Sequence, residues 1–308
     1  MKNKVIILLI ILTFFYLYVY YSIHYNPYTL SPIVTKNIIF DIDHPLHAYN
    51  SSISKEDENY IVYSRIDTWP FKYPRKNIYM GITILDKDLN TISQKIDEPK
   101  PGLVVEDLRP FFWNGQKYFI GTFSKYPKEP IFYPVILDEK YNICNILDKK
   151  MKTYNDNKNF IPIEIEGELY MIKNHNPLEI LKVEKILGND FITDLYYLSN
   201  EKTDIPKLRG STLYEPLGGG RFLGITHTVN YLYKKYQHYF TILNASDPKH
   251  IYIEKVSKPL CLLGGCGIEF AMGFVESFDG KSYVITLGKK DHTSHLVVVN
   301  KEDVNEYF

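Results

Sequence analysis

Glu106 to Ile120 reads EDLRPFFWNGQKYFI: a polar start, a short apolar strand, an Asn-Gly turn, and a second strand rich in aromatic and β-branched residues. The same pattern occurs five times after residue 45, beginning at residues 50, 106, 159, 209 and 268. Successive copies therefore start 56, 53, 50 and 59 residues apart. A repeat of this length made of strands and turns predicts a β-propeller with one blade per copy.

Each copy has room for four strands of about six residues with their turns, which is one full blade. A first strand expected at 37–42 could pair with a terminal strand at 295–299 and so close the ring, which removes an exposed edge. The near-constant period and the absence of a linker disfavour a β-sandwich or two small β domains. The sequence therefore predicts an all-β fold, a five-bladed β-propeller spanning 37–308.

The composition agrees with this fold class and argues against a nucleic-acid partner. The chain of 308 residues is 45% apolar and contains 27 Tyr and 17 Phe, which suit pleated, half-buried surfaces. Lys plus Arg and Asp plus Glu both number 36, so the formal charge is zero. No basic stripe is evident, and a nucleic-acid-binding protein is expected to have one.

The N-terminal region predicts a membrane anchor. Residues 5–21 form an uncharged, mostly apolar run behind Lys2 and Lys4. As a helix this run would be about 26 Å long at about 1.5 Å per residue, close to the roughly 27 Å core of a thin bilayer. A cleaved signal peptide is the alternative, but no small-residue cleavage site follows the run. We expect a cytoplasmic tail and signal-anchor helix at 1–22, a stalk at 23–36, and a propeller that is lumenal or extracellular.

Two further features fit a lumenal or extracellular domain. Asn50-Ser-Ser and Asn244-Ala-Ser are glycosylation sequons, so the sequence predicts a glycoprotein. The three cysteines are Cys144, Cys261 and Cys266. Their spacing matches no standard zinc motif, and it leaves two interpretations open: a Cys261–Cys266 disulfide, or three unpaired thiols.

Candidate chemistry begins at Glu106-Asp107-Leu108-Arg109, directly before the apolar strand of the second copy. Two carboxylates and a guanidinium at the start of an axial strand would cost several kcal/mol to desolvate unless they pair or line a wet pocket. One interpretation is an Asp–Arg clamp that stiffens the blade. The other is a functional site on the propeller axis.

This segment, followed by Trp113-Asn-Gly-Gln-Lys-Tyr-Phe, resembles the Glu-Asp-Pro-Arg…Asn-Gly-x-Tyr-Tyr signature of family 130 glycoside hydrolases and phosphorylases, and the related family 108 β-mannosyltransferases. Both families are five-bladed propellers that act on β-mannosides. Other segments between about 45 and 305 are similar to elements of the same superfamily: Lys158-Asn159-Phe160, Asn176-Pro177, Arg209-Gly210-Ser211, Thr226-His227-Thr228, Cys266-Gly-Ile-Glu269-Phe and Leu287-Gly-Lys-Lys-Asp291. Leu108 departs from the family's Pro but removes no functional group.

The resemblance implies an inverting reaction at the anomeric carbon, with Asp107 as proton donor or relay. An inverting glycosidase also needs a carboxylate that activates water, roughly 6.5–9.5 Å from the acid, and Glu269 from another blade is the candidate. A phosphorylase or transferase instead needs cations around an anion. The substrate-binding candidates are Glu106, Arg109, Lys158, Asn159, Arg209, His227 and Asp291.

Three functions remain open. The first is a membrane-anchored inverting glycosyltransferase that acts on mannoside-type glycans and uses a sugar phosphate or nucleotide sugar. The second is a glycoside hydrolase or phosphorylase on the same fold. The third is a non-catalytic propeller that binds glycans or a protein. We expect no metal site and no cofactor, because this chemistry requires neither.

Overall fold

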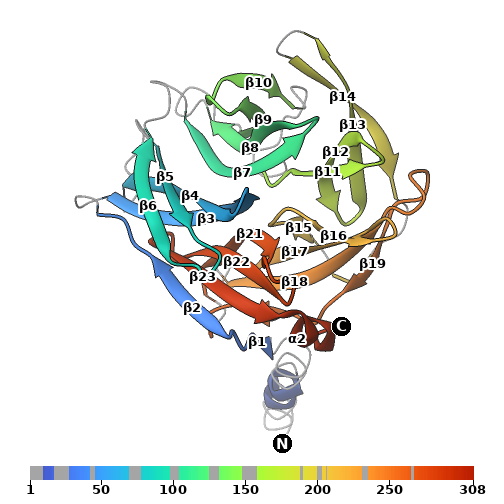
Figure 1. Cartoon of the computed structure of the whole chain (residues 1–308). Helices are drawn as coiled ribbons and strands as arrows, with labels where there is room; N and C mark the ends of the chain where they lie inside the picture. The colour runs from blue at the N-terminus through green and yellow to red at the C-terminus, as the bar shows by residue number, and fades with distance from the viewer. Residues whose placement is uncertain are drawn as a thin grey trace, which may run out of the picture.

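The five copies of the sequence pattern fold into five antiparallel sheets arranged as the blades of a propeller (Figure 1). The fold is known from a computed structural model, which describes residues 10–16, 28–41, 46–68, 78–97, 104–124, 132–147, 158–187, 190–199, 203–205, 207–230, 235–264 and 267–308. The predicted all-β five-bladed propeller is confirmed. Figure 1 shows the first strand of each blade (β3, β7, β11, β15 and β21) around the centre.

Three blades have four strands in simple chain order. Blade 1 contains β3 (Leu46–Glu56), β4 (Asn59–Thr68), β5 (Tyr79–Leu85) and β6 (Thr91–Asp97). Blade 2 contains β7 (Val105–Trp113), β8 (Gln116–Ser124), β9 (Phe132–Asp138) and β10 (Ile143–Ile146). Blade 3 contains β11 (Ile161–Ile165), β12 (Glu168–His175), β13 (Leu178–Leu187) and β14 (Asp190–Leu198).

The other two blades incorporate strands from the N-terminal part of the chain. Blade 4 is built on β15 (Arg209–Gly210), β17 (Arg221–Asn230) and β18 (Lys235–Asn244), with the additional strands β16 (Glu215–Gly218), β19 (Tyr252–Val256), β20 (Leu260–Cys261) and β1 (Tyr28–Thr29). Blade 5 contains β21 (Glu269–Glu276), β22 (Ser282–Lys289), β23 (Thr293–Asn300) and β2 (Val34–Ile38). A short helix, α2 (Lys301–Glu306), ends the chain.

The predicted closure of the ring is confirmed. Strand β2 pairs antiparallel with β23, and Asn37 lies opposite His295. The closing strand covers 34–38 instead of 37–42, and β1 pairs in parallel with β20, so part of the expected stalk belongs to the propeller sheets. Leu30 is buried between these two pairings, which explains why the segment is ordered against the sheets and does not extend away from them.

The hairpins that join the first two strands of a blade use the turn chemistry that the sequence indicates. Asn114 and Gly115 both have positive φ, as do Glu166 and Gly167. Positive φ at both central residues matches the twist of the flanking strands and favours Asn and Gly. The hairpins therefore bring β8 and β12 back along β7 and β11.

The buried apolar side chains fall into five clusters, and each cluster fills the seam between two neighbouring blades. For example, one cluster joins Val105 and Leu108 of blade 2 to Tyr63 and Met80 of blade 1. The apolar faces of the sheets therefore pack against each other between blades. The axis of the propeller is not filled by a single apolar core, and polar residues can lie there.

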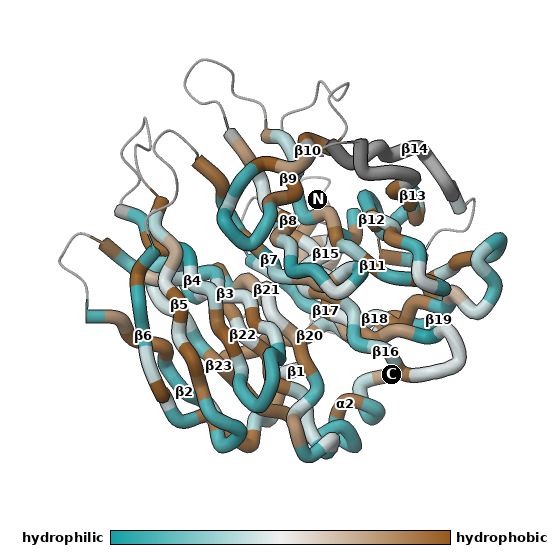
Figure 2. Tube along the Cα trace, turned by 45° about the horizontal axis from the view of Figure 1, so that its top comes forward, coloured by the Kyte–Doolittle hydropathy of each residue, from teal (hydrophilic) through white to brown (hydrophobic). Residues whose placement is uncertain are grey.

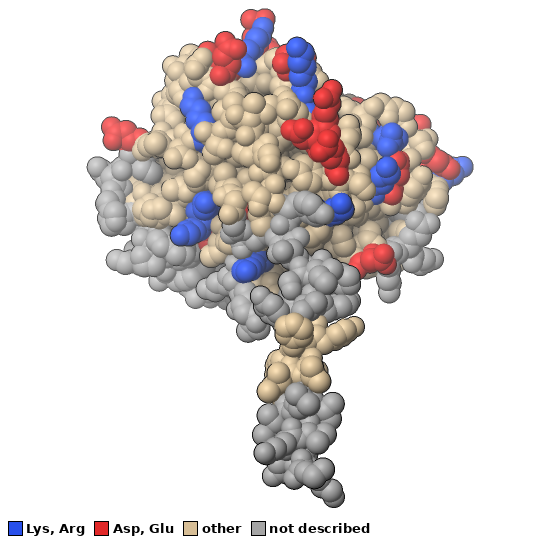
Figure 3. Space-filling view, turned by 90° about the horizontal axis from the view of Figure 1, so that it is seen from below, with Lys and Arg blue, Asp and Glu red and all other residues tan. Residues whose placement is uncertain are grey.

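The N-terminal predictions fall largely outside the described residues. Only 10–16 of the apolar run is described; it is helical, with exposed side chains. Among the residues that the structure describes, no helix has the length and apolar character needed to cross a membrane. Cys261 is disulfide-bonded and Cys144 is a free cysteine, while Cys266 lies outside the described residues. Figure 3 shows acidic and basic side chains interspersed on one face of the molecule.

Candidate active site

Three consecutive blades present a polar residue in the left-handed backbone conformation at the same place. These residues are Asn50, Asp107 and Asn159, with φ values of 49°, 57° and 69°. Asn and Asp tolerate this conformation better than other side-chain-bearing residues. In blades 1 and 2 the pairing register shifts at these positions, between Tyr49 and Ser52 and between Glu106 and Arg109. Such a bulge re-aims a side chain, which is why these residues leave the sheet pattern.

The Asp107 carboxylate lies at the centre of this arrangement. Asn50 Nδ2 donates a hydrogen bond of 3.1 Å to Asp107 Oδ1. Arg65 Nη1 donates to the same oxygen at 3.4 Å. The Asp107 side chain is 13% exposed, so it is oriented by its neighbours and still reaches solvent. This combination suits a group that exchanges a proton with a substrate.

Arg65 forms ion pairs with three carboxylates, and the sequence analysis does not predict it as a site residue. Its guanidinium lies 3.1 Å from Asp67, 3.2 Å from Glu106 and 3.4 Å from Asp107. Burial alone would lower the pKa of Arg65, but Glu106 and the other neighbours raise it well above its ordinary value. The predicted substrate-binding residue Glu106 is thus a buried partner of Arg65, and Lys158 Nζ approaches it at 3.6 Å.

Arg109, predicted as a substrate-binding residue, is held by contacts within the protein. It is 2% exposed, and it donates to Ser211 O at 2.7 Å, to Asp107 O at 3.2 Å and to Asn159 Oδ1 at 3.2 Å. Burial lowers its pKa to about 10, although Asp107 opposes that shift. Arg109 therefore joins blades 2, 3 and 4 through three of its five N–H donors, and its role in substrate binding stays a prediction. Asn159, whose Oδ1 atom accepts the hydrogen bond from Arg109, is half-buried.

Blade 4 contributes Arg209 and His227 to the site. Arg209 is half-buried, and its side chain makes no hydrogen bond or ion pair with the described part of the chain. His227 lies opposite Arg209 in the strand register and is buried, with Nδ1 2.8 Å from Ser211 Oγ. Burial and then the nearby His238 and other cationic groups lower the pKa of His227 well below its ordinary value. A neutral His227 would contact a substrate through hydrogen bonds and not through charge, and its role in substrate binding, like that of Arg209, stays a prediction.

Glu269 is more deeply buried than a water-activating carboxylate needs to be. It is 1% exposed, and its Oε2 accepts hydrogen bonds from the backbone N–H groups of Leu262 at 3.0 Å and Leu263 at 3.3 Å. Its Oε1 has no hydrogen-bond partner among the described residues. The Glu269 carboxylate thus binds the backbone at 262–263 and does not contact bulk water.

The remaining predicted residues lie nearer the surface. Lys158 Nζ is 3.7 Å from the centroid of the Phe132 ring as well as close to Glu106. Asp291 is half-buried in the turn between β22 and β23, with a φ of 50°. The adjacent His292 ring lies 3.7 Å, centroid to centroid, from His47 of blade 1. His292 and its neighbour Asp291 thus lie at the seam between blades 5 and 1, whereas Lys158 lies between blades 2 and 3.

Asn50 is the second site residue that the sequence analysis does not predict, because it interprets Asn50-Ser-Ser as a glycosylation sequon. Its side chain is buried, and the Nδ2 atom that a glycan would occupy donates to Asp107. The prediction of glycosylation at Asn50 is therefore wrong for the folded chain. The signal was available, since Asn50 begins the first copy of the pattern, as Glu106-Asp107 begins the second. Nothing comparable marks Arg65, which lies inside an apolar strand.

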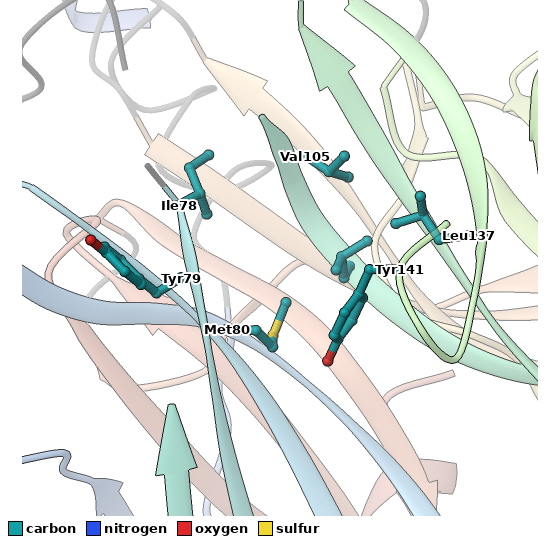
Figure 4. A pocket seen from close by; sticks show the side chains of 7 residues that line it. Ile78, Tyr79, Met80, Val105, Leu137 and Tyr141 are labelled. Atoms are coloured by element: carbon teal, nitrogen blue, oxygen red, sulfur yellow. The ribbon is translucent and has the colours of Figure 1, made fainter. Parts of the chain in front are cut away.

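A small cavity lies behind this site, between blades 1 and 2 (Figure 4). Its volume is about 20 Å³, and it is lined by Ile78, Tyr79, Met80, Val105, Leu108, Leu137 and Tyr141. A cavity needs about 10–15 Å³ and two to four polar partners to hold a water molecule, and this lining is almost entirely apolar. It is a packing defect next to the Asp107 bulge and too small for a sugar.

No family model matches the sequence, and no curated protein matches it. Solved structures share the fold. A GDP-Man-dependent mannosyltransferase from Leishmania mexicana is 13% identical, with a TM-score of 0.62 over 88% of this chain and 90% of that chain. A putative glycoside hydrolase from Parabacteroides distasonis is 11% identical, with a TM-score of 0.61 over 83% and 87%. A β-1,2-mannobiose phosphorylase from Listeria innocua is 13% identical, with a TM-score of 0.57 over 87% and 94%.

The resemblance stated from sequence motifs is thus confirmed for the fold: this propeller is similar to those of family 130 proteins and of a mannosyltransferase. The structural neighbours include glycoside hydrolases, a phosphorylase and a mannosyltransferase. At these identities the likeness establishes the architecture, and the chemistry has to be argued from the site.

Proposed function

We propose that this protein is an inverting carbohydrate-active enzyme, a glycosyltransferase that acts on mannoside-type glycans with Asp107 as its acid or base. One observation carries the proposal. Asp107 is placed at the innermost strand of blade 2 by a bulge and oriented by Asn50 and Arg65, while its carboxylate remains partly exposed. An oriented, accessible carboxylate is the minimum that glycosyl transfer requires of the protein.

The neighbours of Asp107 fit that task. Asn50 donates to Oδ1 and Arg65 donates to the same atom, which leaves Oδ2 as the atom for proton exchange. In the synthetic direction Oδ2 would accept the proton of the acceptor hydroxyl, which then attacks the anomeric carbon as the bond to the leaving phosphate breaks. In the reverse direction Asp107 would return that proton to the glycosidic oxygen. Each direction conserves one proton and inverts the anomeric centre.

Transfer to or from phosphate is better supported than hydrolysis. Arg209 is a cation with no protein partner in the described part of the chain, and Lys158 is partly exposed beside Glu106. An arginine without a side-chain partner among the described residues, together with a partly exposed lysine, suits a phosphate-bearing donor, and Arg binds phosphate oxygens in a bidentate manner. The hydrolase alternative needs Glu269 to activate water, but Glu269 is 1% exposed, and its Oε2 atom accepts hydrogen bonds from two backbone N–H groups. Arg209 would serve the non-catalytic alternative equally well, so the oriented and partly exposed Asp107 is what favours catalysis.

The expected anchor also belongs to this proposal. Residues 5–21 would cross the membrane, with Lys2 and Lys4 on the cytoplasmic side and the propeller on the lumenal or extracellular side. A short tail, one span and a large catalytic domain is the usual layout of glycosyltransferases in the secretory pathway, which is an argument by analogy.

The test combines ligand binding with turnover in the full chain. We would measure thermal stabilisation by GDP-mannose, mannose-1-phosphate and β-manno-oligosaccharides; a ligand at 100 times its Kd adds about 2.7 kcal/mol of stability. Arg209→Ala should abolish the shift from the phosphorylated sugars. The matched control is Arg221→Ala, which removes an arginine that is paired with Glu254 on the surface.

Turnover of the ligand that binds then tests Asp107. Asp107→Asn preserves the shape of the side chain and the acceptor for Asn50, and it should lower kcat by about 10²–10⁴-fold. Turnover that survives in Asp107→Asn would exclude this residue as the acid or base. Stabilisation by neutral glycans only, unaffected by Arg209→Ala, would favour hydrolysis or binding without catalysis.

A further inference from the structure

The N-terminal strand β1 joins the propeller in line with the candidate site. Strand pairing defines one row of residues across blade 4, in which each residue lies opposite the next: Arg209, His227, His238, Leu260 and Tyr28. Arg209 belongs to the candidate site, and Tyr28 is the first residue of β1. Neighbouring strands lie about 4.8 Å apart, so the four steps of this row place Tyr28 about 19 Å to the side of Arg209. The N-terminal part of the chain therefore reaches the propeller at the end of blade 4 that carries the site.

The strand directions define two faces of the propeller. Asn50 and Asp107 lie near the starts of β3 and β7, so the site belongs to the face at which the innermost strands begin. We call it the site face. The turn before β23 lies at this face too, because His292 in that turn contacts His47 at the start of β3. Strand β23 runs away from it for eight residues, and α2 follows, so α2 lies at the opposite face.

Helix 10–16 leaves the propeller on the side of the site face. In the face-on view it lies close to β1 and α2 (Figure 1). The turned view of Figure 2 separates the N-terminal end of the chain from α2, so the two lie on opposite faces. In Figure 3, seen at right angles to Figure 1, residues 10–16 stand clear of the propeller, and their side chains are exposed. The helix thus runs roughly along the propeller axis and away from the site face.

The connection between the apolar N-terminal run and the propeller is short. The run ends at Tyr21, seven residues before Tyr28. Seven residues span at most about 25 Å when fully extended. If 5–21 crosses a bilayer, as proposed above, Tyr28 lies within about 25 Å of the bilayer surface. Because the helix leaves from the site face, this face, and not the one that carries α2, is turned toward the bilayer.

We propose that the site face looks toward the membrane and that the sugar donor is a glycosyl phosphate carried by a membrane lipid. The inference rests on the proposed function and names its donor. Such a donor combines a phosphate that Arg209 can bind with an apolar chain that keeps the sugar at the bilayer surface. It reaches the site from the side on which it is held, and the row from Tyr28 to Arg209 fixes the site beside the point where the anchor joins the propeller.

The transfer step balances with this donor. The bond between the anomeric carbon and the phosphate oxygen breaks, and the oxygen keeps the electron pair, so the lipid leaves as a phosphate monoester. The acceptor hydroxyl forms the new bond to the anomeric carbon, and Asp107 takes its proton and then passes it to water.

Energy transfer to the bilayer tests the orientation. The full chain with Cys144→Ser is placed in phosphatidylcholine vesicles whose headgroups carry an acceptor dye. A donor dye on Leu198→Cys reports the site face, because Leu198 is 53% exposed and β14 ends at that face. A donor dye on Leu217→Cys reports the opposite face. Leu217 is 39% exposed beside the turn that leads to Arg221, six residues before His227 in β17.

We expect the chain to float with the vesicles and position 198 to transfer more energy to the bilayer than position 217. The two dyes differ only in the face that carries them, so the comparison does not depend on turnover. Equal transfer from the two positions, stronger transfer from position 217, or no flotation would each overturn the proposal.

Turnover tests the donor. The wild-type chain in unlabelled vesicles receives mannosyl phosphate on a polyprenyl lipid, soluble mannose-1-phosphate or soluble GDP-mannose, with a β-manno-oligosaccharide as acceptor. Confinement to one surface raises the effective concentration, so we expect kcat/KM for the lipid-carried donor to be roughly 10²–10⁴-fold higher. Arg209→Ala should lower its turnover, and Arg221→Ala should not. Equal kcat/KM for the three donors, or turnover of a soluble donor alone, would overturn the lipid-carried donor and leave the proposed function in place. Turnover of none of them would contradict the proposed function and the inference with it.

Discussion

Replacement of Arg65 by methionine is the sharpest test of how the site is held together. The guanidinium is buried and lies within 3.4 Å of the carboxylates of Asp67, Glu106 and Asp107. Methionine fills a similar volume but leaves three acidic groups without their shared cation. Removal of one partner of a buried ion pair costs about 3–5 kcal/mol, because the remaining charge is desolvated and unpaired. We expect Arg65→Met to lose an amount in this range.

A loss of that size is easy to measure. One kcal/mol corresponds to about 2–4 °C of Tm for domains of a few hundred residues, so Tm should fall by roughly 6–20 °C. Urea unfolding at pH 7 gives the free energy directly if the transition is two-state. The control is Arg221→Met: Arg221 pairs with Glu254 at 2.6 Å, and their side chains are 42% and 22% exposed, far more than those around Arg65. Exposed pairs contribute about 0–1 kcal/mol.

The pH dependence distinguishes lost charge pairing from lost packing. A buried carboxylate without a cation binds a proton more readily than the same group in the unfolded chain. The folded variant therefore binds more protons than its unfolded chain as the pH falls from about 7 towards 4, and its stability deficit shrinks in that direction. A deficit under about 1 kcal/mol, or one that is equal at pH 7 and pH 5, would refute the assignment of Arg65 as the cation that holds the site.

Two further predictions concern the surroundings of the site. Gly288→Ala would place a Cβ 2.6 Å from Asn50 N, so we expect a loss of about 1–3 kcal/mol in urea unfolding and reduced turnover through a displaced Asn50. Unchanged turnover would show that Asn50 does not position Asp107. Burial lowers the pKa of His175 and of His238 to about 3. Below about pH 6.5 each imidazole binds a proton in the unfolded chain but not in the folded one. The free energy of unfolding therefore falls by about 1.4 kcal/mol per pH unit for each histidine between about pH 6.5 and pH 3. Neither ring nitrogen of His175 has a hydrogen-bond partner in the described chain, so His175→Phe should be stable at pH 7 and lose less stability between pH 6 and pH 5; an unchanged slope would contradict this.

The fold was predictable because its signal is local and repeated. Each copy of the pattern contains the alternation and the turn residues of a hairpin, and five copies average out the errors of any single one. The closing pair between Asn37 and His295 followed from topology, since an open ring would expose two edges. The parallel pair of Tyr28 with Leu260 was not predictable, because two-residue strands far apart in the sequence leave no periodic pattern.

The site was predictable only where function and repeat position coincide. Asp107 stands out as an acid at the start of an apolar strand, and the structure places it in a bulge beside Asn50 and Arg65; its catalytic role stays a prediction. Arg109 stands out for the same reason, yet three of its donors bind the protein, and sequence cannot tell which way a guanidinium points. Arg65 could not be predicted from the sequence. A buried cation in the middle of a strand is recognisable only from its partners, here Asp67 in the same strand and Glu106 in β7.

The repeat also explains why a single acid dominates the centre. Blades 1, 2 and 3 build the same left-handed corner and fill it with Asn50, Asp107 and Asn159. The two amides donate and accept hydrogen bonds next to the carboxylate without a charge of their own, so they orient the site and do not compete for its proton. A second carboxylate in either corner would repel Asp107 and raise its proton affinity. The geometry is therefore common to three blades, and among these three only blade 2 has an acid in this corner, which is why the proposed proton transfer is assigned to Asp107.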